Sequence, residues 1–340
     1  MNTPATSASP APHPAQPDAA RLGDWLRAHV ADFRGSVQLH PLAGGQSNPT
    51  FRVEAGDHRW VLRRKPPGVL LASAHAVDRE FRVMRALAGT DVPVPRMHAL
   101  CEDDTVIGSA FYVMDFVEGR VLADASLPGM TPDARGAIYA EMVRVIAAIH
   151  QVDVAAAGLS DYGKPSNYLA RQIDRWTRQY RASETGRIEA MERLIEWLPA
   201  HRPQDEEVSL VHGDFRIDNL IFHPTEPRAL AVIDWELSTL GHPVVDFAYH
   251  CMAWRVTSDE FRGIRGYDWA ALGIPDEAAY TAAYCARTGR SALPNWEYHL
   301  AFNMFRMAAI LQGILARALA GNAAAADAQA TGQRARLMAE

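Results

Sequence analysis

Residues 210–236 read LVHGDFRIDNLIFHPTEPRALAVIDWE and place three oxygen-bearing side chains around a predicted β-hairpin. The apolar runs 220–222 and 229–233 are separated by the Pro-containing segment HPTEPR, which favours two antiparallel strands joined by a turn. This pairing brings Asn219, before the first strand, close to Asp234, after the second, and Asp214 enters from the loop just upstream. Because carboxylates beside buried strands need a functional or hydrogen-bonding reason, we expect the three side chains to converge on one site.

Phosphoryl transfer requires such a site. Hard oxygen ligands hold Mg2+ against the phosphates of ATP, and a separate carboxylate orients the attacking hydroxyl and accepts its proton. We therefore expect Asp214 to be the catalytic base, and Asn219 and Asp234 to be Mg2+ ligands. The alternative is a structural loop, because HGD alone is common turn chemistry and His212 could be a satisfied, partly buried histidine.

The motif HGDFRIDN followed by IDWE resembles the catalytic-loop and metal-loop pair of the aminoglycoside phosphotransferase and choline kinase family, which shares the bilobal fold of protein kinases. The HRD, DFG and APE motifs of protein kinases proper are absent from the sequence. The resemblance implies an α+β, bilobal, protein-kinase-like fold with a small β-rich N-lobe and a larger, mostly helical C-lobe. It also implies ATP and Mg2+ as cofactors, and His212 and Asp246 as structural support for the catalytic loop. From its position alone, Asp246 could instead be a charge that favours a helix N-terminus.

A Gly-containing turn in the N-terminal part is the candidate phosphate loop. The segment PLAGGQSNPTFRV (41–53) runs from this turn into an alternating strand. Small side chains and backbone amides there can approach phosphate oxygens; the candidates are Gly44, Gly45, Ser47 and Asn48. Taken alone, the segment is better explained by an ordinary hairpin turn.

The strand predicted over 60–66 offers two cations. Alternation places Val61, Arg63 and Lys65 on one face. The resemblance implies a phosphate-binding Lys two residues after a small apolar residue, and aligned on Val61 that position is Arg63. Arg supplies similar electrostatic stabilisation through a wider fork, so either Arg63 or Lys65 could meet the phosphates, and a solvated basic strand end is the third interpretation.

Two further segments complete the predicted nucleotide site. A helix is predicted over 73–87, with Ser73 as its cap and Glu80 beside its apolar stripe, and the resemblance implies that Glu80 pairs with Arg63. The segment FYVMDFVEG (111–119) resembles the linker between lobes. That resemblance places Met114 behind adenine, with the Asp115 carbonyl and the Val117 amide reading its edge, although an ordinary buried strand also fits.

The remaining chain is predicted to be mostly helical. A helix over 131–151 begins at the cap Thr131, and amphipathic helices are expected within 166–200 and 276–320. We expect three parts: a disordered tail over 1–17, an N-lobe with a leading helix over 18–117, and a C-lobe over 118–340.

The resemblance implies a hydroxyl of a small molecule as the phosphate acceptor. The helix at 168–180, with 65–71 and 305–313, resembles the kinase-like region fused to some acyl-CoA dehydrogenases. This implies a hydroxylated acyl group, or its CoA thioester, as acceptor; the candidate acceptor-site residues are Tyr168, Gln172, Arg175, Trp176, Glu236 and Arg306. Glu236 could also be a second contact near the metal or an exposed turn residue. For the other candidates, the alternative is that Trp176 is a core residue and that the arginines form a solvated face of the helix.

Charge argues weakly against a polycationic antibiotic as acceptor, because residues 160–202 carry eight Lys and Arg against six Asp and Glu. The whole chain of 340 residues has a net charge of −6, so the sequence gives no sign of the basic surface that binds nucleic acid.

Three widely spaced cysteines indicate reduced thiols in a cytoplasmic protein. No secretory signal is recognised, and the most apolar segment, 301–320, is interrupted by Arg and Gln residues, so no membrane span is expected. The oligomeric state is left open.

Three other functions remain as alternatives. The first is an aminoglycoside-type or other small-alcohol kinase. The second is a nucleotide-binding pseudokinase with a regulatory role, favoured only by Arg63 in place of Lys. The third is a metal-dependent hydrolase built on His212, Asp214, Asp234 and His242, although the sequence lacks a clustered His/Asp ligand pattern for it.

Overall fold

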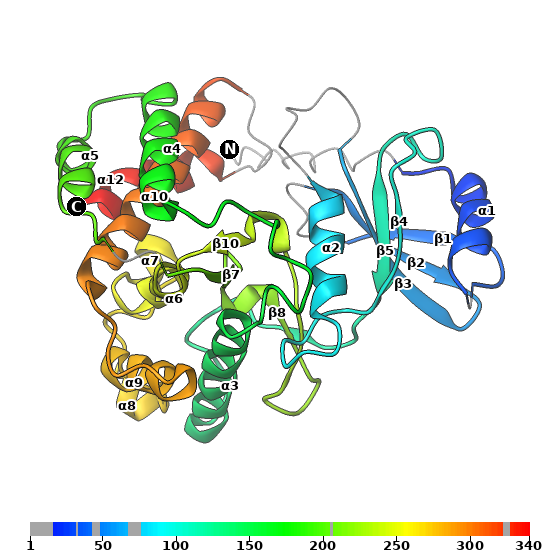
Figure 1. Cartoon of the computed structure of the whole chain (residues 1–340), viewed down its shortest axis with the longest axis horizontal. Coiled ribbons are helices and arrows are strands. Elements are labelled where there is room, and N and C mark those ends of the chain that lie inside the picture. The colour runs from blue at the N-terminus through cyan, green and yellow to red at the C-terminus, as the bar shows by residue number, and fades with distance from the viewer. Residues whose placement is uncertain (1–15, 32, 43–47, 67–75, 205–206, 322–326) are drawn as a thin grey trace, which may run out of the picture.

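The computed structural model describes residues 16–31, 33–42, 48–66, 76–204, 207–321 and 327–340, which form two lobes (Figure 1). The N-lobe contains one antiparallel sheet in the order β1-β2-β3-β5-β4. Its strands are β1 (Gln38–Pro41), β2 (Thr50–Ala55), β3 (His58–Arg64), β4 (Met97–Cys101) and β5 (Phe111–Asp115). Helix α1 (Ala19–His29) covers one face of the sheet and α2 (Val77–Leu87) lies between the sheet and the C-lobe.

The predicted alternation along the third strand is present. Trp60 and Leu62 pack in an apolar cluster with Leu22 and Leu26 of α1. Val61 belongs instead to a cluster that includes Phe81 of α2 and continues into the C-lobe. Because successive side chains of a strand point to opposite faces, Arg63 lies on the same face as Val61, towards the space between the lobes.

The C-lobe is mainly helical around short strands. Its α-helices are α3 (Pro132–His150), α4 (Tyr168–Ala182), α5 (Glu189–Ala200), α6 (Pro243–Cys251), α7 (Ser258–Phe261), α8 (Trp269–Leu272), α9 (Glu277–Thr288), α10 (Trp296–Leu319), α11 (Ala328–Gln333) and α12 (Ala335–Ala339). The 3-10 turns are η1 (Ile217–Asn219), η2 (Trp235–Leu237) and η3 (Met252–Trp254). Strands β6 (Arg120–Val121), β8 (Leu220–Phe222) and β9 (Ala229–Val232) form one sheet, and β7 (Ser209–Val211) pairs with β10 (Thr239–Gly241).

The predicted hairpin and central helix are confirmed. Strands β8 and β9 pair antiparallel with Leu220 opposite Val232. Helix α3 begins after Thr131, whose side chain accepts a hydrogen bond from the Ala134 amide, with Pro at its first position. This arrangement is typical of helix N-termini, since it satisfies an amide that lacks an intrahelical partner.

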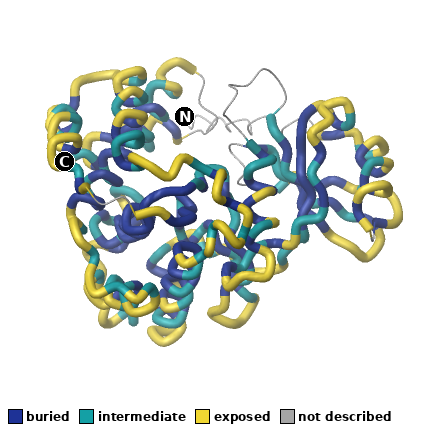
Figure 2. The backbone as a smooth tube through the Cα atoms, viewed as in Figure 1, coloured by how far each residue is buried: buried dark blue, intermediate teal, exposed yellow. Residues whose placement is uncertain are grey.

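Two sequence predictions were wrong. Helix α2 begins at Val77, with Ala76 as a cap that forms no side-chain hydrogen bond, and the proposed cap Ser73 lies outside the described residues. The second concerns α10, whose polar residues were expected to make it too polar to span a bilayer: its length and composition are those of a helix that could cross a membrane. In the described structure, 67% of the most apolar 18-residue stretch of α10 is buried, as expected for a core helix. Figure 2 shows the buried backbone at the centre of both lobes.

The link between the lobes passes close to the β8–β9 hairpin. Strand β6 pairs with β8, with Arg120 opposite Phe222. A Cβ added at Gly119 would lie 2.3 Å from the Phe222 carbonyl oxygen and 2.6 Å from Ile221 Cγ2. Only glycine therefore fits where the linker crosses β8.

Gly119→Ala is expected to lower the free energy of unfolding by about 1–3 kcal/mol, because the added methyl group must displace the backbone of β8. Thermal and urea unfolding measure the change. Gly186→Ala is the matched control, since a Cβ there meets nothing within 4 Å. Equal stabilities for the two variants would contradict the close approach.

Candidate functional site

The catalytic loop is held by the buried carboxylate of Asp246. The His212 amide donates to Asp246 Oδ2 and the Gly213 amide to Oδ1, both at 2.8 Å. His150 Nε2 lies 3.2 Å from Oδ2. Burial alone raises the pKa of Asp246, but the hydrogen bond and charge of His150, with the contribution of His212, hold that pKa below its usual value. The carboxylate is thus ionised and fixes two consecutive amides; its place at the start of α6 adds a favourable helix-dipole interaction.

His212 connects the catalytic loop to the strand end that carries Asp234. Its Nδ1 accepts a hydrogen bond from the Asp214 amide at 3.2 Å, so Nε2 carries the proton and donates to the Ile233 carbonyl at 3.0 Å. The ring also packs 4.8 Å from that of Trp235. The buried imidazole therefore sets the relative position of the two acidic residues.

Asp214 lies at the centre of a polar network. Its Oδ1 accepts a hydrogen bond from the Tyr249 hydroxyl and lies 3.1 Å from Arg216 Nε. Its Oδ2 accepts from Asn219 Nδ2 at 3.2 Å, and the same Nδ2 donates to the Asp214 backbone carbonyl at 2.8 Å. The carboxylate is oriented by three side chains. Burial lowers the pKa of Arg216, but the Tyr249 oxygen and the nearby carboxylates raise it. The pKa of Arg216 therefore lies above its usual value.

Sequence reasoning missed Tyr249 and Arg216. Tyr249 lies three residues after Asp246 on α6, a spacing that places both side chains on the same helix face. Arg216 lies inside the quoted motif, two residues after Asp214. Both positions were visible in the sequence, but only the fold shows that they reach the Asp214 carboxylate.

Asn219 and Asp234 are brought together by the hairpin. The Ile233 amide donates to the Asn219 carbonyl at 3.0 Å. Asp234 adopts a left-handed conformation with φ of 67°, which is uncommon for a residue with a Cβ and is associated with functional sites. Because Asn219 Nδ2 donates to Asp214, its amide oxygen is the atom left for another partner. An amide oxygen beside a carboxylate fits the oxygen ligands that Mg2+ takes.

Arg63 crosses between the lobes to these acidic groups. Its Nε lies 3.1 Å from Glu80 Oε2, so the expected ion pair is present. Its Nη2 lies 2.7 Å from Asp234 Oδ1 and 3.6 Å from Glu236 Oε2. Lys65 instead lies 3.8 Å from Asp78 Oδ1. Of the two candidate cations, Arg63 is therefore the one placed beside Asp234.

Glu80 holds Arg63 from a buried position on α2. The Tyr112 hydroxyl donates to Oε2, and Asn48 Nδ2 donates to Oε1, both at 3.0 Å. Burial raises the pKa of Glu80 to about 7; Arg63 opposes this shift, and Asp234 adds to it. Asn48 thereby ties the end of the Gly-containing turn to α2. The other turn candidates, Gly44, Gly45 and Ser47, lie outside the described residues.

The predicted linker residues lie at the end of β5 and just after it. Met114 is buried opposite Val61 in the paired strands β3 and β5. Asp115, the last residue of β5, accepts a hydrogen bond at Oδ1 from His98 Nε2 at 2.6 Å, and Val117 follows two residues later. Their contact with adenine stays a prediction.

Five of the acceptor candidates form one cluster between α4 and α10. Gln172 Oε1 accepts a hydrogen bond from Trp176 Nε1 at 3.1 Å. The guanidinium carbons of Arg175 and Arg306 lie 5.2 Å and 5.5 Å from the Trp176 ring. Burial raises the pKa of Tyr168, from the first turn of α4, to about 12. Burial and the charge of Arg306 lower the pKa of Arg175.

Arg306 attaches this cluster to the catalytic loop. Its Nη2 donates to the Gly213 carbonyl at 2.6 Å, and its guanidinium lies 4.9 Å from the Tyr249 ring. It is buried, which excludes the solvated arginine face at this position. Trp176 is also buried, as the core alternative expected. Glu236 does not join the cluster: it is partly buried beside Arg63.

The ligand set of the hydrolase alternative is not assembled. The His242 ring packs 5.2 Å from that of His299. Among the described residues, no group of three or more His, Cys, Asp or Glu side chains is arranged to hold a metal ion. The proposed quartet with His212 therefore lacks support.

Comparison with known proteins identifies the family. Residues 38–285 match the model of the phosphotransferase enzyme family. The chain belongs to this family. It is 50% identical over 308 residues to the mouse protein acyl-CoA dehydrogenase family member 10, covering 90% of this chain but 29% of that relative. The chain thus spans less than a third of that relative's length.

Solved structures show the same kinase-like fold. A putative aminoglycoside phosphotransferase from Ralstonia eutropha JMP134 is 57% identical, with a TM-score of 0.89 over 96% of this chain and 97% of that one. A thermostable mutant of an aminoglycoside phosphotransferase, in ternary complex with ADP and hygromycin B, is 18% identical, with a TM-score of 0.59 over 89% and 94% of the two chains. The second likeness concerns the fold alone.

Asp246→Asn is expected to lower the free energy of unfolding by about 1–3 kcal/mol, because one of the two buried loop amides would face an NH2 group and lose its acceptor. Urea unfolding measures the loss. Asp174→Asn is the control, since its ion pair with Arg178 on α4 is exposed and contributes little. If both variants unfold at the same urea concentration, Asp246 does not brace the loop.

Glu80→Gln is expected to change how stability depends on pH. The folded protein retains a proton on Glu80 up to a pKa of about 7, whereas the unfolded chain loses it near pH 4.5. Ionising Glu80 therefore costs stability as pH rises between these values, and Gln removes that cost. The stability of Glu80→Gln minus that of the unsubstituted protein should increase from pH 5 to pH 7.5, by up to about 3 kcal/mol.

Urea unfolding at a series of pH values measures this difference. Glu118→Gln, whose ion pair with Arg59 is exposed, should show no such trend. A difference for Glu80→Gln that is constant with pH would show that Glu80 ionises normally in the folded protein.

Proposed function

We propose that the protein transfers the γ-phosphate of ATP, in the presence of Mg2+, to a hydroxyl of a small molecule. The observation that carries this proposal is the convergence of Asp214, Asn219 and Asp234 on one site, with Arg63 reaching Asp234 from the other lobe at 2.7 Å. A carboxylate oriented for a hydroxyl, an oxygen pair for a cation and a guanidinium for phosphates are the elements of phosphoryl transfer.

Each residue has a defined role in the proposed reaction. Asp214 orients the acceptor hydroxyl and takes its proton as the oxygen attacks the γ-phosphorus; the bond from that phosphorus to the bridging oxygen breaks and ADP leaves. Asn219 and Asp234 would hold Mg2+, which neutralises phosphate charge when bound. Arg63, held by Glu80, stabilises the phosphates.

The remaining nucleotide contacts come from the sheet and the linker. Gly44, Gly45, Ser47 and Asn48 would cover the phosphates. Met114, Asp115 and Val117 would contact the adenine, as the resemblance implies. The hydrogen bond from Asn48 to Glu80 supports the first assignment, because it ties this turn to the residue that orients Arg63.

Arg63 is compatible with an active enzyme. Its Nε faces Glu80, while Nη2 faces the acidic groups of the C-lobe. The guanidinium thus forms the ion pair with Glu80 through one nitrogen and presents a second nitrogen to the C-lobe. A Lys side chain would have to make both interactions through its single amine nitrogen. Since the base and both oxygen ligands are also present, the pseudokinase alternative has little support.

We infer a hydroxyacyl group, or its CoA thioester, as the acceptor. The relative of 50% identity is named as an acyl-CoA dehydrogenase family member. The cluster between α4 and α10 presents Arg175 and Arg306 near Trp176, and its cationic character suits an anionic acceptor. A polycationic aminoglycoside would be repelled there.

Asp214→Asn is expected to lower kcat by about 10²- to 10⁴-fold, the usual contribution of a general base, and to leave nucleotide affinity within about twofold. ADP release with a panel of hydroxyacyl-CoA thioesters and a panel of aminoglycosides measures turnover, and calorimetry with ATP and Mg2+ measures binding. Asp133→Asn, exposed on α3, is the control.

The outcomes separate the alternatives. Full turnover by Asp214→Asn would refute the role of Asp214. Phosphorylation of aminoglycosides alone would favour the antibiotic kinase, and nucleotide binding without transfer to any acceptor would favour the pseudokinase.

A further inference from the structure

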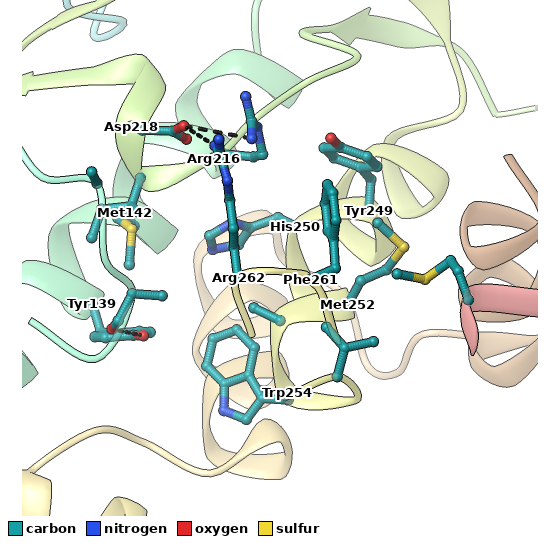
Figure 3. A pocket seen from close by; sticks show the side chains of 16 residues that line it. Tyr139, Met142, Arg216, Asp218, Tyr249, His250, Met252, Trp254, Phe261 and Arg262 are labelled. Atoms are coloured by element: carbon teal, nitrogen blue, oxygen red, sulfur yellow. Dashed lines mark hydrogen bonds and ion pairs between the residues drawn. The ribbon is translucent and has the colours of Figure 1, made fainter. Parts of the chain in front are cut away.

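A second feature adjoins the residues around Asp214: a pocket in the C-lobe that is partly open to solvent (Figure 3). It is bordered by the segment 123–125 after β6, α3, residues 216–218, the end of α6, η3, α7 and α12. Its walls are mainly apolar and include Met142, Met252, Trp254, Phe261 and Met338. Pockets of this kind recognise ligands mainly by apolar contact.

The polar atoms of the aromatic walls are already satisfied by the protein. The Tyr139 hydroxyl donates to the Ala125 carbonyl at 2.7 Å, and Trp254 Nε1 donates to the Pro275 carbonyl at 2.9 Å. His250 Nε2 lies 2.8 Å from the Tyr280 hydroxyl, and burial lowers the pKa of His250 to about 4, so this ring is neutral at pH 7. These walls therefore offer a ligand apolar surface.

The charged groups gather on one side of the pocket (Figure 3). Asp218 Oδ2 lies 2.8 Å from Arg262 Nη1 and 3.5 Å from Arg216 Nη1. The one carboxylate that lines the pocket is thus shared by its two arginines. This balance disfavours a cationic ligand and accepts a neutral or anionic one.

The pocket shares its wall with the catalytic carboxylate. Arg216 and Tyr249 both line it, and both contact Asp214 Oδ1. Asp214 does not line the pocket, so a ligand seated there lies one side chain away from the proposed base. The Arg306 guanidinium also lies 4.9 Å from the Tyr249 ring. The pocket and the arginine cluster between α4 and α10 therefore both contact Tyr249.

We propose that this pocket binds the apolar chain of the alcohol acceptor and selects acceptors by the length of that chain. The proposal rests on the proposed phosphotransferase function and narrows its acceptor to alcohols with an aliphatic segment beside the reacting hydroxyl. The hydroxyl lies at Asp214, and the chain extends between α3 and η3, towards Met142 and Met252.

The test compares chain-length profiles. Each methylene buried in the pocket should improve kcat/KM about three- to fourfold, measured with hydroxyacyl-CoA thioesters that differ only in the methylenes beyond the hydroxyl. Ala253→Met fills the pocket from η3, and it should lower the ratio of kcat/KM between the longest and shortest acceptor at least tenfold. Ala286→Met, exposed on α9, should keep the original ratio.

A second measurement separates this proposal from the function on which it rests. Straight-chain alcohols of increasing length are titrated against the full-length protein, with tryptophan fluorescence as readout, in the unsubstituted protein and in Ala253→Met. Binding that tightens with length and is lost in Ala253→Met supports the pocket even if no acceptor is phosphorylated. Transfer to hydroxyacyl thioesters with the same length profile in both proteins, and no alcohol binding, overturns the pocket assignment and leaves the phosphotransferase function standing.

Discussion

The candidate site depends on one buried carboxylate that binds the backbone of the loop before Asp214. Asp246 accepts the amides of two consecutive loop residues, which fixes the backbone immediately before Asp214. His212 links the loop to the end of β9 by a hydrogen bond to the Ile233 carbonyl. Arg306 of α10 donates a hydrogen bond to the Gly213 carbonyl. The loop is therefore defined by hydrogen bonds from three directions, and the orientation of Asp214 follows from them. Such preorganisation of a catalytic group is a large part of what a protein fold contributes to a reaction.

The second constraint is electrostatic. Arg63 lies among Glu80, Asp234 and Glu236, so one cation is matched against three acidic side chains. Burial favours the protonated form of Glu80 and raises its pKa to about 7, which partly relieves the imbalance. A bound cation at Asp234 would relieve it further, and Arg63 would then be released to the phosphates. The charges that join the lobes at Arg63 would thus favour the proposed nucleotide complex.

The sequence was sufficient where chemistry and local geometry coincide. The spacing of Asp214, Asn219 and Asp234 around two short apolar runs predicted their convergence, because strand pairing determines it. Alternation along β3 placed Arg63 correctly, but the choice between Arg63 and Lys65 needed the position of α2. Tyr249 and His150 were missed because their contacts join segments distant along the chain, whereas Arg216 lies two residues after Asp214 and only the fold shows that it reaches that carboxylate. The pocket was also missed, because its walls come from several helices and loops whose apolar residues are indistinguishable in sequence from ordinary core.

The central claim is that Asn219 and Asp234 hold the metal of a nucleotide whose γ-phosphate faces Asp214. Anomalous diffraction from crystals grown with Mn2+ and a non-hydrolysable ATP analogue tests it most directly. We expect a Mn2+ peak in contact with both Asn219 and Asp234, Arg63 turned from Asp234 to the phosphates, and the Asp214 carboxylate directed at the γ-phosphate without binding the metal. A metal coordinated by Asp214 and a histidine, or a nucleotide that avoids the space between the lobes, would contradict the account.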